Sequence, residues 1–412
     1  MKKIIALIML PLLLTACDKI GSSKITGLID LTSRLEVEDA SEFKKLNSGK
    51  NNPFTNQKSK SYKLAKHTII GKPAFAKGIK YSVDKKGYVS AFSIKQKKRI
   101  WTADIAKDAL DRNFNAGGVL FNNGKLYVTN NSRYLIVLDA QNGQEIIRKE
   151  FPDIIRVKPV MATDKLLLVQ TISNQLIAYD IKSSNLVWMH EGGLEIISTK
   201  NHVPPVVYNG HAIVSYSSGE VIYIDVTDGK AKWSYNLYNT TDVGLPSFDP
   251  AVIVTNPIIR GEYAYFATSN GKVIKIDLDN GAPAWLKIAD DVQSMSLEGD
   301  NLFVTNNARQ VAAISAHNGK VSWVGNLISI KDRAAKKPSP AAFQNPFVSH
   351  TDNGLALNVI ASNGELYQFI QDKSGKLPTQ PKIIKIEKGV RYYWISCCNE
   401  NLHLITNYNI RY

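Results

Sequence analysis

Alternating side chains and tight turns make up a repeated unit in this chain. In residues 219–233, GEVIYIDVTDGKAKW, one set of side chains, Val221, Tyr223 and Asp225, alternates with Ile222 and Ile224, which is the period of a β-strand. An Asp-Gly pair that ends at Gly229 follows, and a second short stretch ends at Trp233. Because Gly, Asn and Asp accept positive φ angles, such pairs are typical of tight turns between antiparallel strands. The unit therefore predicts two strands and a turn, with the leading Asp bonded to turn amides.

The same unit recurs at intervals of about 40 to 50 residues, which is the spacing of repeat architectures. Three copies depart at the Asp or Gly place, with Ser93, Ser184 and Ser315, and one has Ile147 in the Trp place. The copies are residues 87–101, 133–147, 174–188, 219–233, 271–285 and 309–323, with a weaker one at 364–378. We expect the Trp rings to be buried between neighbouring sheets, since a large flat ring packs well there.

Two further strand signals precede each unit, as in residues 262–271 and 301–310, which makes four strands per repeat. No amphipathic helical stretch of comparable strength is present. The pattern predicts an all-β protein, a β-propeller with four antiparallel strands per blade. The tail at 399–412 resembles the middle strands of one more blade, and residues 60–66 with Tyr62 would supply its outer strand. We therefore expect eight blades, with seven as the fallback.

The N-terminus has the pattern of an exported lipoprotein. Lys2 and Lys3 precede an apolar stretch that is too short to span a bilayer, and Leu14-Thr15-Ala16 leads to Cys17. We expect a signal peptide at 1–16, a lipidated Cys17, a flexible polar tether over 17–60 and the propeller over 61–412. Residues 40–46 are a candidate for a short helical turn. Asp18 favours the inner membrane in enteric bacteria, so the choice of membrane stays open.

The net charge of +15 points to a polyanion as a possible partner. Export argues against nucleic acid and leaves anionic lipid headgroups, an acidic protein, or lysines that only keep the surface soluble. Apart from Cys17, the cysteines are the neighbours Cys397 and Cys398, and a disulfide between adjacent residues would be strained.

Motifs for catalysis are scarce. The seven histidines form no metal-binding pair, and neither a nucleophile elbow nor a phosphate-binding loop is present. We expect no catalytic residue, no cofactor and no metal. The Cys397–Cys398 pair keeps a quinone-dependent oxidoreductase open as an alternative, because the chain resembles the propeller of quinone-dependent alcohol dehydrogenases, which have an adjacent-cysteine disulfide against the cofactor.

The Asp-x-x-x-Gly-x-x-x-Trp repeat resembles that of the pyrroloquinoline-quinone-type propeller family. With the lipidation motif, the tether and the blade count, the chain resembles the BamB-like lipoproteins of outer-membrane protein assembly. That resemblance implies a non-enzymatic, monomeric scaffold on the periplasmic face of the outer membrane. It would bind an Omp85-type barrel-assembly protein and other subunits of that machinery, and aid insertion of outer-membrane proteins. An adaptor for another envelope complex is the other alternative.

In that family two neighbouring loops form the partner surface, one with an apolar pair before Arg and one with Asp-x-Asp before Pro. Here the loops are residues 194–205 and 235–257, and Lys replaces Arg while valines take the Asp places. Because Lys lacks the planar fork of Arg, the partner's matching surface would differ too. The expected partner-binding residues are Ile196, Ile197, Lys200, Asp249, Val252 and Val254. The basic loop 324–346 is expected to matter little to this contact.

Overall fold

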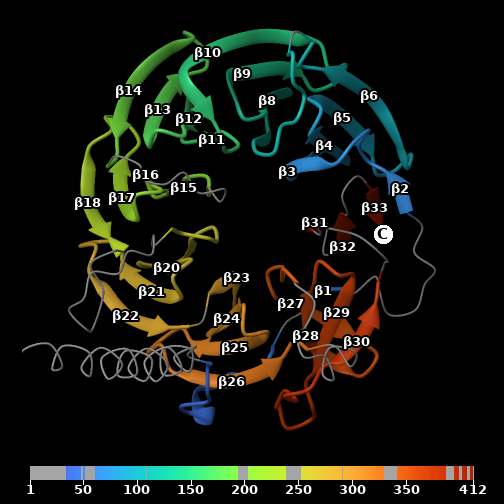
Figure 1. The fold of residues 1–412 in the computed structure, drawn as a ribbon, viewed down its shortest axis with the longest axis vertical. Helices are drawn as coiled ribbons and strands as arrows, with labels where there is room; N and C mark the ends of the chain where they lie inside the picture. The colour runs from blue at the N-terminus through green and yellow to red at the C-terminus, as the bar shows by residue number, and fades with distance from the viewer. Residues whose placement is uncertain are drawn as a thin grey trace, which may run out of the picture.

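The protein is built almost entirely from β-strands arranged in a ring (Figure 1). The computed structural model describes residues 34–47, 50–51, 61–107, 109–193, 203–237, 252–289, 291–328, 341–386, 394–398, 401–405 and 409–411. Within these ranges the single helical element is the short 3-10 turn η1 (Ala40–Glu42), in agreement with the turn expected at 40–46. No helix among them is long and apolar enough to cross a bilayer.

Seven sets of four consecutive antiparallel strands form the blades, numbered here 1 to 7 in chain order. Blade 1 contains β3 (Ile69–Ala76), β4 (Ile79–Asp84), β5 (Tyr88–Ser93) and β6 (Lys98–Asp104). Blade 2 contains β7 (Gly118–Asn122), β8 (Lys125–Thr129), β9 (Ser132–Asp139) and β10 (Glu145–Ile155). Blade 3 contains β11 (Val160–Met161), β12 (Leu166–Gln170), β13 (Gln175–Asp180) and β14 (Asn185–Glu191). Blade 4 contains β15 (Val206–Tyr208), β16 (His211–Ser215), β17 (Glu220–Asp225) and β18 (Ala231–Asn236).

The remaining blades follow the same order. Blade 5 contains β19 (Ile258–Arg260), β20 (Tyr263–Ala267), β21 (Lys272–Asp277) and β22 (Pro283–Ile288). Blade 6 contains β23 (Val292–Glu298), β24 (Asn301–Asn306), β25 (Gln310–Ser315) and β26 (Val321–Asn326). Blade 7 contains β27 (Phe347–Thr351), β28 (Gly354–Ile360), β29 (Glu365–Ile370) and β30 (Lys382–Lys385). In each blade the first strand lies toward the centre of the ring and the fourth lies outside (Figure 1).

The expectation of eight separate blades is not supported, because the described chain forms seven sheets. Five strands besides the seven sets belong to the sheet of blade 7: β1 (Lys50–Asn51), β2 (Ser61–Lys63), β31 (Trp394–Cys398), β32 (Asn401–Ile405) and β33 (Asn409–Arg411). The physical reason is β1, which pairs in parallel with both β27 and β32 and so joins the tail to blade 7. The expected pairing of the first strand with the tail is confirmed, since Tyr62 on β2 lies opposite Ile410 on β33.

The repeated Trp connects five of the blades, numbers 1, 3, 4, 5 and 6, to the blade that follows, which agrees with its expected place between neighbouring sheets. The indole N–H of Trp188 donates to the Val226 carbonyl at 2.9 Å, and that of Trp233 donates to the Leu278 carbonyl at the same distance. Three further tryptophans repeat the bond: Trp101 with Ala140, Trp285 with Ala316, and Trp323 with Leu377. Since each acceptor belongs to the following repeat, the rings bridge neighbouring blades.

The leading Asp of each full copy holds its own turn. Asp225 Oδ1 accepts from the Thr227 N–H at 2.7 Å, and the Asp225 carbonyl accepts from the Gly229 N–H at 3.0 Å. The Thr227 hydroxyl first, and then the Thr227 N–H, hold the pKa of the Asp225 carboxyl below its usual range. The motif therefore builds the blades, which leaves recognition to other parts of the ring.

Candidate functional site

Both loops expected to form the partner surface leave the ring at the same end. The first connects β14 with β15 and the second connects β18 with β19, so each runs from an outer strand to the next inner strand. In a four-stranded antiparallel sheet the fourth strand ends where the first began. All outer-to-inner connections of a ring of such sheets therefore lie on one face, which we call the loop face.

The described ends of these two loops meet. Val203 from the first loop and Val254 and Asn256 from the second line one cavity of about 310 Å³. Val203 also packs against a hydrophobic cluster that contains Leu237 and Ile253, the buried residues at both ends of the second loop. The prediction that the two loops lie side by side is thus confirmed for the residues that the structure describes.

Val252 does not point to solvent as an interface anchor would. Its side chain is only 4% exposed, and its backbone pairs with Ser269: the Val252 N–H donates to Ser269 Oγ at 3.2 Å, and the Ser269 N–H donates to the Val252 carbonyl at 2.8 Å. Its expected role as a contact residue is therefore wrong in this conformation; it fastens the loop to blade 5. Val254 is half-buried and does line the cavity.

The other expected site residues lie outside the described residues. They are Cys17, Ile196, Ile197, Lys200 and Asp249, together with the basic side chains of the loop 324–346. Cys397 and Cys398 lie on β31, opposite Leu402 and Asn401 of β32. Across the described ranges no group of three or more His, Cys, Asp or Glu residues could hold a metal ion.

Gln293 is a site residue that the sequence does not reveal. It lines three adjoining cavities of about 460, 420 and 310 Å³ that extend along the loop-face end of blades 5, 6 and 7. Its Oε1 atom accepts from the Phe343 N–H at 2.7 Å, so it also connects blade 6 to the segment before blade 7. No local pattern identifies such a residue, because the cavity forms only when inner strands of several repeats converge.

The cavity of about 310 Å³ is lined by a cationic side chain and by several side-chain amides. Lys72 from β3 lines it together with Gln293, Gln344 and Asn345. Burial, followed by repulsion from Lys72, lowers the pKa of Lys158. An anionic or amide-bearing group would find suitable partners at this opening.

Ring, repeats and bridging tryptophans together define a β-propeller of the pyrroloquinoline-quinone repeat type. Residues 85–324 match the family model described as outer membrane protein assembly factor BamB. The chain belongs to this family.

Both a more similar relative and a less similar one agree with that assignment. A Rickettsia conorii protein described as uncharacterized is 41% identical over 100% of this chain and 99% of its own length. The outer membrane protein assembly factor BamB of Shewanella oneidensis is 23% identical and aligns over 76% of this chain and 79% of its own. The crystal structure of BamB from Moraxella catarrhalis superposes with a TM-score of 0.63 at 15% identity, covering 85% of this chain and 95% of that chain, which shows the shared fold.

Proposed function

We propose that this chain is a scaffold lipoprotein of the machinery that assembles outer-membrane β-barrels, and that its loop face docks onto the periplasmic domains of an Omp85-type assembly protein. Membership in the BamB family supports the process, since the named relatives are outer membrane protein assembly factors. The meeting of Val203 with Val254 and Asn256, from the described ends of the two loops, at one cavity supports the choice of surface. The role is a binding role, and it needs no cofactor.

The anchor in this proposal is a lipid on Cys17, after cleavage of residues 1–16. It would hold the ring at the periplasmic face of the outer membrane, with the inner membrane as the alternative that Asp18 leaves open. A single lipid anchor and a monomeric ring leave the loop face free to meet a folded partner.

The proposed contact has an apolar centre and a charged rim. Ile196, Ile197 and Val254 would supply the centre, and Lys200 and Asp249 the rim. Val252 stabilises the loop from beneath through its bonds with Ser269. A few anchors carry most of the energy in interfaces of this kind, so single substitutions at the centre should be decisive.

Replacing Ile197 with Asp tests the proposal directly. The change would bury an unpaired charge at the centre of the contact, so we expect affinity for the purified periplasmic domains to fall by about 2 kcal/mol or more, which is roughly 30-fold. Lys200→Ala should act less and mostly at low salt, since a rim charge is screened by ions. Binding is measured by calorimetry with the propeller and the Omp85-type domains in solution.

Ile146→Asp is the matched control, because Ile146 is 45% exposed on β10, the outer strand of blade 2. It should melt like the parent and bind like it. Equal affinities for Ile197→Asp and Ile146→Asp would place the interface elsewhere. Absence of binding by the parent would instead point to another envelope partner.

A further inference from the structure

Residues 35–46 are fastened across the outer edge of blade 6, although their polar composition reads as a flexible tether. Two apolar side chains anchor the segment, and each is 6% exposed. Leu35 packs in the cluster that joins blades 5 and 6, and Leu46 packs in the cluster that joins blades 6 and 7. The Gln310 side-chain amide makes two hydrogen bonds with the Leu35 backbone. Its Oε1 atom accepts from the Leu35 N–H at 3.0 Å, and its Nε2 atom donates to the Leu35 carbonyl at 3.0 Å. We call residues 35–46 the clasp.

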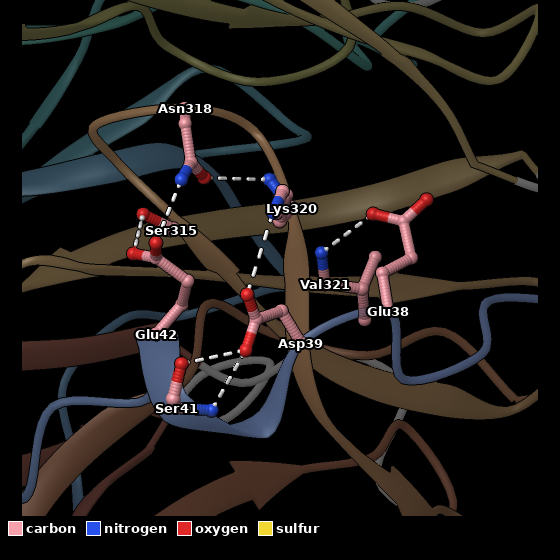
Figure 2. Close-up of polar contacts among 8 residues, drawn as sticks. All are labelled: Glu38, Asp39, Ser41, Glu42, Ser315, Asn318, Lys320 and Val321. Atoms are coloured by element: carbon pink, nitrogen blue, oxygen red, sulfur yellow. Dashed lines mark hydrogen bonds and ion pairs between the residues drawn. The ribbon is translucent and has the colours of Figure 1, made fainter.

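The middle of the clasp lies along the free edge of β26. The Glu38 and Asp39 N–H groups donate to the Val321 carbonyl at 2.8 and 3.1 Å. In return the Val321 N–H donates to Glu38 Oε2 at 2.9 Å (Figure 2). An exposed edge strand is open to pairing with any extended chain, so the clasp covers an edge that would otherwise be available.

The acidic residues of the clasp face cations of blades 5 and 6. Lys287 at the end of blade 5 pairs with Glu38 at 2.5 Å, and Lys320, just before β26, pairs with Asp39 at 3.4 Å. Burial alone would raise the pKa of Glu38, but the Lys287 and Val321 bonds and the nearby cations outweigh it, so the pKa is lowered. The edge therefore fits an acidic segment.

Glu42 completes the turn of blade 6. In four other copies an Asp begins the turn, but here Ser315 takes its place. Glu42 brings the missing carboxylate from outside: it accepts from Ser315 Oγ at 3.1 Å and from Asn318 Nδ2 at 2.8 Å (Figure 2). The turn thus presents two donors to a carboxylate that is about 270 residues away in the chain. The clasp therefore makes a specific contact with this turn in addition to covering the strand edge.

We propose that the outer edge of blade 6 is a receptor for the chain's own acidic segment, and that the clasp is where the membrane tether is fastened to the ring. The tether part rests on the proposed lipid at Cys17. An extended chain spans at most about 3.5 Å per residue, so Cys17 would reach about 60 Å from Arg34 but about 115 Å from Lys50, where β1 would otherwise be the first attached element. The clasp therefore nearly halves the reach and makes the tether leave the ring at blade 6.

Trypsin tests the clasp in the purified full-length chain, because it cleaves after Lys44 and Lys45 within the clasp and after Lys19 outside it. Mass spectrometry gives the ratio of clasp cleavage to Lys19 cleavage. For the double variant Glu38→Gln, Glu42→Gln we expect that ratio to rise at least ten-fold, since Glu38 loses its ion pair with Lys287 and Glu42 loses the charge that strengthens its bonds from Ser315 and Asn318. Glu36→Gln is the control: it removes one carboxylate charge from the same segment at an exposed residue, and it should change the ratio less than two-fold.

Two outcomes overturn the proposal: rapid cleavage after Lys44 and Lys45 in the parent, or an equal rise for Glu36→Gln. A third arm separates the clasp from the anchor. Cys17→Ser should release the chain from the membrane fraction and leave the cleavage ratio unchanged. Retention of that variant on membranes would refute the lipid at Cys17 and with it the reach of the tether, while the cleavage ratio still decides on the receptor.

Discussion

In four of the repeats the glycine is required by the tryptophan of the preceding blade. A Cβ atom on Gly229 would lie 2.7 Å from the Trp188 ring, and one on Gly281 would lie 2.7 Å from the Trp233 ring. Both glycines also have φ angles of +75°, which disfavour a side chain. Where Ile147 takes the Trp place, the next blade has Ser184 at a φ of 60°. The motif therefore spans two blades: one supplies the ring and the next supplies the space for it.

Gly281→Ala should destabilise the protein by about 2–4 kcal/mol, because a strained φ and overpacking against Trp233 add up. Ser184→Ala is the control, since a side chain is already accommodated there at positive φ. It should cost less than about 1 kcal/mol. Urea unfolding followed by Trp fluorescence measures both variants. Similar urea midpoints for the two variants would mean that packing against the Trp233 indole is not the reason for glycine at position 281.

Single residues were predictable from sequence where their partner is local or repeated. The Asp225 turn and the bridging Trp233 follow from a pattern that recurs, and both are confirmed. The burial of Val252 was not predicted, because the sequence does not show whether an apolar residue near a loop end faces a partner or packs against its own blade. Glu42 was missed because its partners lie far along the chain and only the closed ring brings them near.

At the scale of elements, the clasp shows where composition misleads. Residues 40–46 were predicted to form a short turn, and η1 is found there. The segment was expected to be part of a flexible polar tether over residues 17–60. Its docking depends on an uncovered edge at β26 and on Lys287 and Lys320, and none of these follows from the segment itself.

The clasp should loosen in acid. Lys287, Lys320 and the Val321 N–H hold the pKa of Glu38 low, and the Ser41 hydroxyl, with Ser41 N–H and Lys320, does so for Asp39. A lowered folded pKa adds stability above the unfolded pKa, and that stability is lost as the pH falls through the folded value. We expect Glu38→Gln to melt below the parent at pH 7 and to match it at about pH 3, by calorimetry. A difference that persists in acid would contradict the ionic role, and Glu36→Gln should show none at either pH.

At the scale of the whole molecule, the two ends of the chain close the ring together. β2 pairs with β33, and just after β2 the side chains of Leu64 and Ala65 are fully buried with Ile69 and Phe92 of blade 1. The repeat copies were predictable from the recurring motif, and the pairing near Tyr62 was predictable from the unfinished tail. The merging of blade 7 with the tail was not, since β1 is only two residues long and has no sequence pattern.

Stepwise N-terminal truncation should separate these contributions to stability. Deleting 18–33 should leave the melting temperature of the chain unchanged, because the clasp, β1 and β2 remain. Deleting 18–51 also removes Leu35, Leu46 and β1, and we expect a loss of several kcal/mol from lost burial and pairing. Deleting 18–66 further removes β2 and the buried Leu64, so the ring opens and melting should fall again. If the last two truncations melt together, β2 does not close the ring; Leu64→Ala in the full chain then shows whether packing alone holds that edge.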